Sequence, residues 1–236
     1  MRVLQKIIPG ELEMILEKHK LWLATDGKEG ESADLSYTDL EGADLRCVNL
    51  YRANLRHACL SGARFGNADL RCADLRCADL VRADLTGAIL IGANLGGADL
   101  SGSNLTFVSL AYTDLTKANL TDVKNFPNIP MACPESGSFT GWKRACGYIV
   151  KLEIPEDAKR SSGTGEKCRC SKAKVLSIEN KDGTSSGVSE VRSDYDENFI
   201  YRIGEIVTVD DFDDNRFNEC APGIHLYMNK SFATGY

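Results

Sequence analysis

The sequence lacks any apolar run of the roughly 18 to 20 residues that would span a bilayer. Its opening residues meet Pro9 and then Glu11 and Glu13 before any long apolar stretch, so we expect no signal peptide. Without such a signal, the nine cysteines indicate reduced thiols in a cytoplasmic protein rather than a disulfide framework. We therefore expect no contact with a membrane.

A strong charge of one sign is lacking as well. The net charge of −6 is spread evenly, because residues 31–125 hold 12 acids and 9 bases and residues 126–236 hold 17 acids and 14 bases. Mimicry of DNA needs a dense negative surface, and binding of DNA needs a basic one. The sequence favours neither. With 43% apolar and 26% charged residues, the 236-residue chain has an ordinary globular composition and room for one large or two modest domains.

The most regular feature is a large apolar residue at every fifth position from Leu35 to Leu120, a leucine everywhere except at Phe65. A small or β-branched residue, mostly alanine, lies two positions before each, and Asp or Asn usually lies between the two. A period of five fits neither a helix, with its period of 3.6, nor a strand, with its period of 2.0. The pattern therefore predicts a chain that turns every five residues and stacks its turns into a solenoid.

This stretch resembles the pentapeptide-repeat family, whose motif A(D/N)LXX is present as ADLRC at 73–77 and ANLGG at 93–97. The resemblance implies a mainly β fold, a right-handed quadrilateral β-helix over residues 31–126 with four repeats in each square coil. Eighteen repeats then make about four and a half coils. The resemblance also places the Leu and Ala side chains inside, in a structural ladder that includes Leu35, Leu55, Leu75, Leu95 and Leu115.

A short amphipathic helix is predicted before the repeats, over residues 10–24. Its apolar face carries Leu12, Ile15, Leu16, His19, Trp22 and Leu23. An open end of a β-helix exposes apolar side chains and unpaired backbone groups. We therefore expect residues 1–30 to be an N-terminal capping segment, with His19 at the polar edge of the cap.

Function in such a rod is expected at the positions that the motif leaves free, because the motif Asp and Asn side chains are needed to hydrogen-bond the turns. Residues twenty apart should stack, one coil on the next. We expect four arginines to converge along one corner of the middle coils: Arg52, Arg56, Arg71 and Arg76. This corner contacts either an anionic partner or, in the interpretation we favour, the neighbouring acids of the repeats.

The later coils are small and uncharged on the outside, with Gly87, Gly92, Gly96, Gly97, Ser101 and Gly102. The register leaves Ile89 and Ile91 exposed. Such a smooth repeat face suits packing against a protein. We expect the C-terminal domain or a second copy of the chain, giving a homo-oligomer, to occupy this face in preference to a foreign partner. The rod cysteines, which we expect to be surface thiols, are Cys47, Cys59, Cys72 and Cys77.

The fivefold register ends at Asn125, and the composition changes after Phe126. Alternating β-branched residues predict strands at 147–155, 172–179 and 199–209 in a small, mostly β or α+β domain over residues 127–236. This domain resembles the domain of unknown function that follows pentapeptide repeats in bacteriophage-type proteins, through CPESGSFTGWK at 133–143, AKRSSGTGEKCRCSKAK at 158–174 and FNECAPGIHLY at 217–227. The resemblance implies a viral source and action in the host cytoplasm, and it supplies no activity.

Three kinds of site are open in this domain. Its spacings do not match the paired ligands of the usual zinc sites, so we predict no metal and no cofactor although the chain offers Cys133, Cys168, Cys170, Cys220 and His225. A Cys/His nucleophile pair made by Cys220 or Cys133 with His225 needs spatial proximity. A basic, glycine-broken loop over 159–174 either cradles a phosphate or is a solvated hairpin loop; its cations are Lys159, Arg160, Lys167, Arg169, Lys172 and Lys174.

We expect a non-enzymatic interaction or scaffold protein, with the rod as docking wall or spacer. The C-terminal domain would bind a host or phage macromolecule and could inhibit a host enzyme or defence. The alternative is a nucleotide- or small-molecule-handling domain, enzymatic or not, around the 159–174 loop and His225. Some pentapeptide-repeat proteins are understood as DNA mimics that modulate topoisomerases, and the balanced charge disfavours that function here. A protein partner is expected, and DNA is not.

Overall fold

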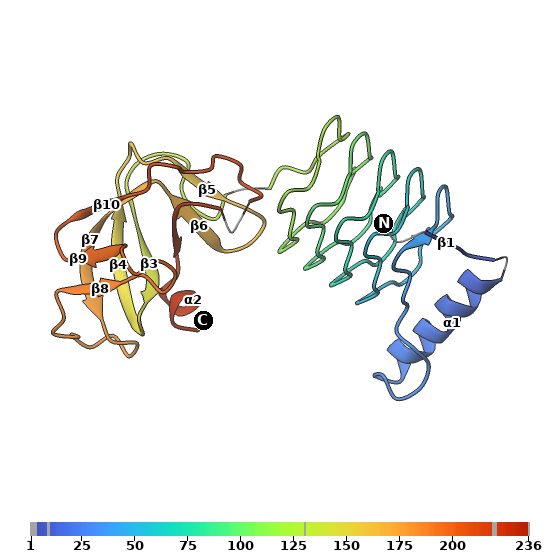
Figure 1. Ribbon diagram of the computed structural model, residues 1–236, viewed down its shortest axis with the longest axis horizontal. Helices are drawn as coiled ribbons and strands as arrows, with labels where there is room; N and C mark the ends of the chain where they lie inside the picture. The colour runs from blue at the N-terminus through green and yellow to red at the C-terminus, as the bar shows by residue number, and fades with distance from the viewer. Residues whose placement is uncertain (1–3, 9, 130, 219–220, 236) are drawn as a thin grey trace. The chain divides into compact units, whose positions relative to one another are not determined.

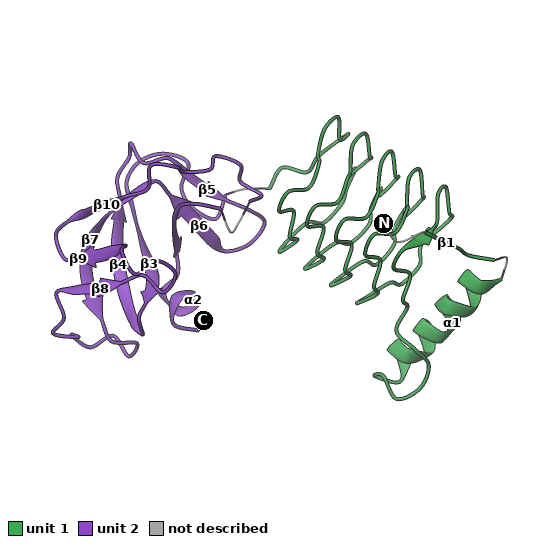
Figure 2. Cartoon of the chain, in the orientation of Figure 1, with its two compact units in different colours: residues 1–129 green, residues 130–236 purple. Residues whose placement is uncertain are grey.

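The computed structural model describes residues 4–8, 10–129, 131–218 and 221–235 of the chain. The chain divides into two compact units, residues 1–129 and residues 130–236, and each is described by itself (Figure 2). The fold is mainly β (Figure 1). Within the described ranges, neither helix is long and apolar enough to cross a membrane.

The repeat unit is a stack of coils held together by parallel backbone bridges. Each bridge joins residues twenty apart, as in Asp34 to Asn54 and Asn54 to Asp74, and four such ladders start at residues 34, 39, 44 and 49. One coil therefore contains four repeats, as the resemblance to pentapeptide-repeat proteins implies. Apart from Ala43, which is half-buried, the inward Leu and Ala side chains are almost completely buried from Ala33 to Leu110. Close packing of this ladder forms the core of the unit.

Every corner of the coils requires a left-handed backbone conformation. The residue two positions after each inward Leu, or after Phe65, has a positive φ, from Tyr37 to Asp122. Only six of these eighteen corner residues are glycine. This conformation costs an ordinary residue roughly 1–2 kcal/mol. The corner is held by the next coil, since corner N–H groups such as that of Tyr37 donate to a carbonyl there, in this case Arg56 O at 2.9 Å.

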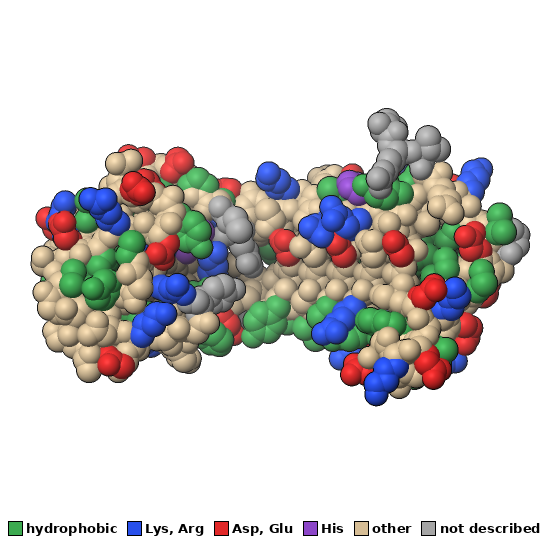
Figure 3. Space-filling view, turned by 60° about the horizontal axis from the view of Figure 1, so that its bottom comes forward, with side chains coloured by type: hydrophobic (Ala, Val, Ile, Leu, Met, Phe, Trp, Pro, Cys, Tyr) green, Lys and Arg blue, Asp and Glu red, His purple; other side chains and the backbone are tan. Residues whose placement is uncertain are grey.

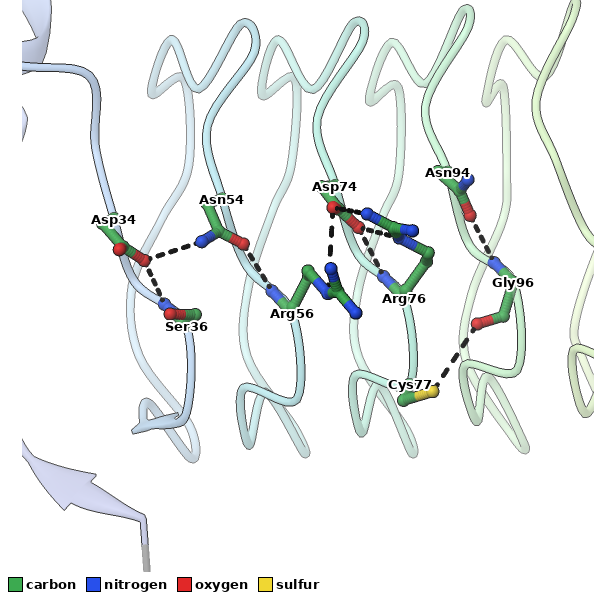
Figure 4. A network of polar contacts seen from close by, with 9 residues as sticks. All are labelled: Asp34, Ser36, Asn54, Arg56, Asp74, Arg76, Cys77, Asn94 and Gly96. Carbon is green, nitrogen blue, oxygen red and sulfur yellow. Dashed lines mark hydrogen bonds and ion pairs between the residues drawn. The ribbon is translucent and has the colours of Figure 1, made fainter. Parts of the chain in front are cut away.

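The motif Asp and Asn side chains bond the backbone two residues on, as predicted. Ser36 N donates to Asp34 Oδ1 at 3.0 Å, and Gly96 N donates to Asn94 Oδ1 at 2.9 Å (Figure 4). Asn54 Nδ2 also donates to Asp34 Oδ1 of the previous coil at 2.9 Å. These side chains are committed to the turns and to contacts between coils, so they are structural.

The N-terminal helix α1, Glu11–Ala24, confirms the predicted amphipathic helix and lies at the first coil (Figure 1). The expectation for His19 was wrong: the side chain is completely buried, and Ala33 N donates to its Nδ1 at 3.0 Å. The ring therefore joins the helix to the start of the first coil. Strand β1, Gln5–Lys6, pairs in parallel with β2, Thr38–Asp39, and covers part of the open backbone edge. The sequence pattern did not predict this strand.

The C-terminal unit is built on a seven-stranded antiparallel sheet in the order β10-β7-β4-β3-β11-β6-β5 (Figure 1). These strands are β3 Phe139–Ala145, β4 Tyr148–Ile154, β5 Arg160–Ser162, β6 Lys167–Cys170, β7 Lys172–Glu179, β10 Ile206–Thr208 and β11 Ile224–Tyr227. A hairpin of β8, Glu190–Arg192, with β9, Ile200–Arg202, and the short helix α2, Lys230–Gly235, complete the unit. The core contains Val150, Leu152, Val175, Tyr201 and Leu226.

Two of the three predicted strands are confirmed as β4 and β7. The third, over 199–209, was wrong as one strand. The segment forms β9 and β10, which belong to different sheets. Between them the chain turns at Gly204, whose φ of 88° is favourable for glycine alone.

Candidate functional site

The predicted arginine corner is largely neutralised by acids of the same repeats. Arg71 and Arg76 each form a bidentate pair with the acid two residues before them, at 2.6 Å to Asp69 Oδ2 and 2.5 Å to Asp74 Oδ2. These pairs lower the pKa of both carboxyl groups, first through the arginine side-chain hydrogen bonds. Figure 3 likewise shows Lys and Arg side chains interspersed with Asp and Glu on the repeat unit.

The other two arginines extend these contacts. Arg56 Nε lies 3.9 Å from Asp74 Oδ2, so Asp74 faces two arginines (Figure 4). The guanidiniums of Arg52 and Arg71 lie 5.1 and 5.6 Å from the ring centre of Tyr51. The predicted set is thus arranged around one carboxylate and one aromatic ring. Exposed pairs of this kind contribute little stability, about 0–1 kcal/mol each.

A second surface of the repeat unit is apolar. Ile89 and Ile91 are 37% and 36% exposed, as the register predicts, and the following coil adds Phe107 at 88% and Tyr112 at 59%. Tyr112 follows the corner glycine Gly92 by twenty residues, so it occupies the equivalent corner of the next coil. We call these four residues the apolar side. Sequence reasoning found the isoleucines and missed both aromatic residues.

The segment 159–174 is not the loop that we predicted. It forms β5, β6 and the start of β7, and its two arginines bond backbone carbonyls of the unit. Arg160 donates to five backbone carbonyls, among them Gly137 O at 2.7 Å and Glu156 O at 2.8 Å. Arg169 is buried and donates to Asn215 O at 2.8 Å and Pro222 O at 3.2 Å. These two guanidiniums hold loops in place.

The four predicted lysines of the segment are dispersed. Lys159 pairs with Asp214 at 3.2 Å, and Lys172 pairs with Asp157. Lys174 is exposed on β7, opposite Ile206. Lys167 lines a cavity, which is described below. The six cations therefore do not form one phosphate cradle.

The cysteines and the histidine that the sequence offers as zinc ligands are also divided. Cys133, Cys168 and Cys170 are buried in the core, where the Cys133 and Cys168 thiols are hydrogen-bonded to each other. That bond lowers the pKa of Cys133, while burial raises the pKa of Cys170 to about 12. Cys220 lies outside the described residues. Among the residues that are described, three close metal-ligating side chains occur together at Asp39, Glu41 and Cys59, on the repeat unit.

His225 lies on β11 at the wall of a cavity. Its Nε2–H donates to Ala221 O at 3.1 Å. Burial, followed by the charge of Lys167, lowers the pKa of His225 to about 4, so the ring is neutral at pH 7. The cavity has a volume of about 680 Å³ and is lined by residues of β3, β6, β9 and β11 and of the segments beside them, including Lys143, Lys167, Phe199, Tyr201, Asp210 and His225.

Two family models match this chain. Pentapeptide repeats (8 copies) match at residues 31–62, 49–87 and 83–122, which are the coils described above. The chain is a pentapeptide-repeat protein. A family of unknown function, DUF5758, matches residues 129–233, nearly the whole C-terminal unit of this pentapeptide-repeat protein. Pentapeptide-repeat proteins are typically non-enzymatic and act through contacts with other proteins.

Solved structures with similar repeats come from several sources. A pentapeptide-repeat protein of the Arabidopsis thaliana thylakoid lumen is 32% identical, with 43% of this chain and 70% of that chain covered and a TM-score of 0.40. Rfr23 from the cyanobacterium Cyanothece 51142 is 35% identical, over 39% of this chain and 56% of that one, with a TM-score of 0.28. The fluoroquinolone-resistance protein QnrB1 is 21% identical, over 44% and 61%, with a TM-score of 0.26. The comparison with curated proteins gave no match.

Proposed function

We propose that the chain is a non-enzymatic interaction protein whose repeat unit docks another protein on the apolar side, formed by Ile89, Ile91, Phe107 and Tyr112. The coils provide a rigid support for these side chains. The C-terminal unit would contribute a second binding surface. Action in a bacterial host cytoplasm, as a phage product that inhibits a host enzyme or defence, belongs to this proposal through the resemblance of residues 133–227.

The observation that carries the proposal is the state of Phe107. Its side chain is 88% exposed, and its φ is 57°. A residue other than glycine adopts that conformation at a cost, as at the other corners of the rod, and a side chain left in water gains nothing from burial. Glycine occupies six equivalent corners of the same rod. Because the fold gains nothing from phenylalanine at this corner, a binding role accounts for it.

The chemistry of the apolar side defines the partner. Aromatic residues are enriched among those that dominate binding energy at protein interfaces, where they enter apolar pockets and become desolvated. Two aromatic rings beside two isoleucines, with no charged side chain among the four, suit an apolar groove or patch on another protein. They do not suit nucleic acid, whose phosphates require cations.

Site-specific photo-crosslinking tests the proposal. A benzoylphenylalanine replaces Phe107 in the full chain, expressed in its natural host cell. The matched control places the same group at Asp122, an exposed corner residue of the same rod with a φ of 55°. We expect a discrete crosslinked protein at position 107, absent at 122, and reduced about ten-fold by Ile91→Asp, because a charge in an apolar interface is costly to desolvate.

Equal crosslinking at both positions, or a crosslink that survives Ile91→Asp unchanged, would contradict the proposal. The purified chain crosslinked alone supplies a further arm. A covalent dimer formed through position 107 would identify the partner as a second copy, which is the homo-oligomer expected from the smooth repeat face.

Topoisomerase modulation by DNA mimicry receives no support from the charges of the rod. Asp44, Asp69 and Asp74 are each paired with an arginine, and these cations interrupt the dense negative surface that would imitate a row of phosphates. We expect the purified chain to leave DNA supercoiling by gyrase unchanged. A concentration-dependent inhibition would restore that function as a candidate.

A further inference from the structure

The cavity of the C-terminal unit has properties that docking by the repeat unit does not use. At about 680 Å³ it falls within the range of small-molecule sites, roughly 300–1,000 Å³. Its wall combines Lys143 from β3, Lys167 from β6 and His225 from β11 with the aromatic pair Phe199 and Tyr201.

Lys143 is the most informative residue of this wall. The residue is only 8% exposed, and within the described part of the chain its ammonium group makes no hydrogen bond or ion pair. The acid whose charge acts on it, Asp194, has its Oδ1 engaged by Cys146 N at 2.7 Å. Burial lowers the pKa of Lys143. A cation that lines a cavity without a partner is partly desolvated, and an anionic ligand would offset the cost of that desolvation.

The surroundings of Lys143 strengthen this positive end. Lys167 is close enough for its charge to lower the pKa of Lys143 further. Lys143, Lys167 and Arg169 all act against protonation of His225. The histidine therefore remains neutral and, because its Nε2–H bonds Ala221 O, it keeps Nδ1 as an acceptor. One anionic group is what this end of the cavity lacks.

The rest of the wall suits an aromatic body. Phe199 and Tyr201 meet edge to face, with ring centres 5.3 Å apart, and Tyr201 is 2% exposed. Val209 adds an aliphatic surface, and Asp210 and Asp211 lie at the wall as acceptors. A flat ring packs well on such aromatic surfaces. The acids, with Asp196, would repel a ligand that carries several negative charges.

We propose that this cavity binds a small aromatic molecule with one anionic group, held by Lys143 and Lys167, and with its ring against Phe199 and Tyr201. The ligand chemistry is shared by aromatic carboxylates and by nucleoside monophosphates. Hydroxyl or amino groups at the far end of the ligand would donate to Asp210 and Asp211. This site goes beyond the proposed docking function and does not depend on it.

The first test uses anilinonaphthalene sulfonate, an aromatic monoanion that fluoresces when bound, with the full chain. Its neutral analogue, anilinonaphthalene, keeps the rings and lacks the anion. We expect saturable binding of the sulfonate at one site and binding of the neutral analogue about ten-fold weaker, because the charge-assisted contact to Lys143 is lost.

Variants locate the site. Lys143→Met keeps most of the side-chain volume and removes the charge, so affinity for the sulfonate should fall about ten-fold while affinity for the neutral analogue is unchanged. Lys174→Met, on the same sheet and exposed, is the matched control and should bind as the natural chain does. Circular dichroism verifies the fold of each variant. Should Lys143→Met fail to fold, Lys167→Met, which changes a half-buried residue, provides the same comparison.

Displacement of the bound sulfonate distinguishes the two natural ligand classes. Competition by adenosine or guanosine monophosphate would assign the site to nucleotides, and competition by indole acetate or hydroxybenzoate would assign it to aromatic carboxylates. No saturable binding of the sulfonate, equal affinity for the neutral analogue, or unchanged affinity in Lys143→Met would each overturn the proposal. The apolar side of the repeat unit is intact in all these variants, so the docking proposal is tested separately.

Discussion

The contacts that stabilise the two units of the chain join residues at very different distances in the sequence. In the repeat unit an arginine pairs with the acid two residues before it, as Arg71 does with Asp69, and each coil bonds the coil twenty residues on. In the C-terminal unit Lys159 pairs with Asp214, and β3 pairs with β11 through Trp142 and Tyr227. In the rod, these regular contacts engage the Asp and Asn side chains of the motif. Long-range assembly leaves Lys143 buried and without a partner.

The difference separates two ways of carrying a function. In the rod, the motif residues are needed for the fold, so a function depends on the outward-facing residues. Here these residues are those of the apolar side. The C-terminal unit encloses a cavity and places charged residues from distant strands around it. The following predictions test whether the two units unfold independently. They also test whether the stability of the rod can be changed separately from docking on the apolar side.

The largest effect is expected from Gly30→Ala in the cap. A Cβ at this position would lie 2.2 Å from Lys18 O, and the φ of 76° is unfavourable for alanine. The two effects should lower the free energy of unfolding of the repeat unit by about 3 kcal/mol. Urea unfolding, followed separately in each unit by hydrogen exchange, measures the change.

Gly10→Ala is the control for Gly30→Ala. Its φ is 87°, and no atom lies within 4 Å of the added Cβ, so only the conformational cost remains, about 1 kcal/mol. Equal effects at both glycines would show that the backbone around residues 18 and 30 shifts to accommodate the added Cβ at little cost. A simultaneous loss in the C-terminal unit would show that the two units unfold together.

Acidification should affect the C-terminal unit through His225. The unfolded chain takes up the proton near pH 6.5, whereas the folded pKa is about 4. The unfolded state thus binds more protons between these values, so stability falls as the pH is lowered through that window, by about 3 kcal/mol at most. His225→Gln keeps a donor for Ala221 O and cannot titrate, and denaturant unfolding at pH 7.0 and 4.5 should show a smaller loss.

His19 provides the corresponding test in the repeat unit. Burial lowers its pKa, so the same sign applies and stability falls with the pH below the unfolded value. His19→Asn retains an acceptor for Ala33 N and should reduce this dependence. A pH response that neither variant alters would locate the titrating group elsewhere. Measurements above pH 4.5 avoid the carboxyl groups, whose lowered pKa values act in more acidic solution.

Phe107→Gly should separate the stability of the rod from docking on the apolar side. Glycine adopts the positive φ of this corner freely, and the exposed phenylalanine side chain contributes almost no burial. We expect the unfolding free energy to rise by about 1 kcal/mol while docking on the apolar side is lost. Thermal unfolding and the crosslinking assay measure the two. Destabilisation would mean that the ring packs on the rod and is structural.

The smallest effect concerns the ion pair of Arg71. Asp69→Asn keeps an oxygen for Arg71 N, which now donates to Asp69 Oδ1 at 3.2 Å, and removes only the charge. The expected loss is about 0.5 kcal/mol at low salt, and salt should abolish it. Asp69→Ala also removes the turn acceptor and should cost about 1 kcal/mol. Equal losses would show that the turn bond contributes nothing.

The sequence predicted the rod because a leucine at every fifth position indicates both where the chain turns and which side chains face the core. It could not predict that Phe107 and Tyr112 stand in left-handed corners, since twelve of the eighteen corners carry residues other than glycine. In the C-terminal unit the alternation of β4 and β7 was visible. Strands β5 and β6 were mistaken for a loop because Arg160 and Arg169, which normally indicate solvent, bond carbonyls inside the unit.

The cavity could not be foreseen for the same reason. Lys143 occurs in a strand that alternates Gly141, Lys143 and Ala145 on its buried positions, where a lysine is not expected. His225 was considered for its chemistry, but its neighbours come from strands that the sequence pattern left unpaired. Only the register of β3, β11 and β6 brings them together.

The four bridge ladders also fix the length of one coil at twenty residues. Inserting or deleting twenty residues would change the length of the rod by one coil and leave each remaining side facing as before. A change of five residues would keep every leucine inside and every corner left-handed, yet it would turn all later residues to the next of the four sides. One repeat gained or lost ahead of Ile89 would thus redirect the apolar side without disturbing the core.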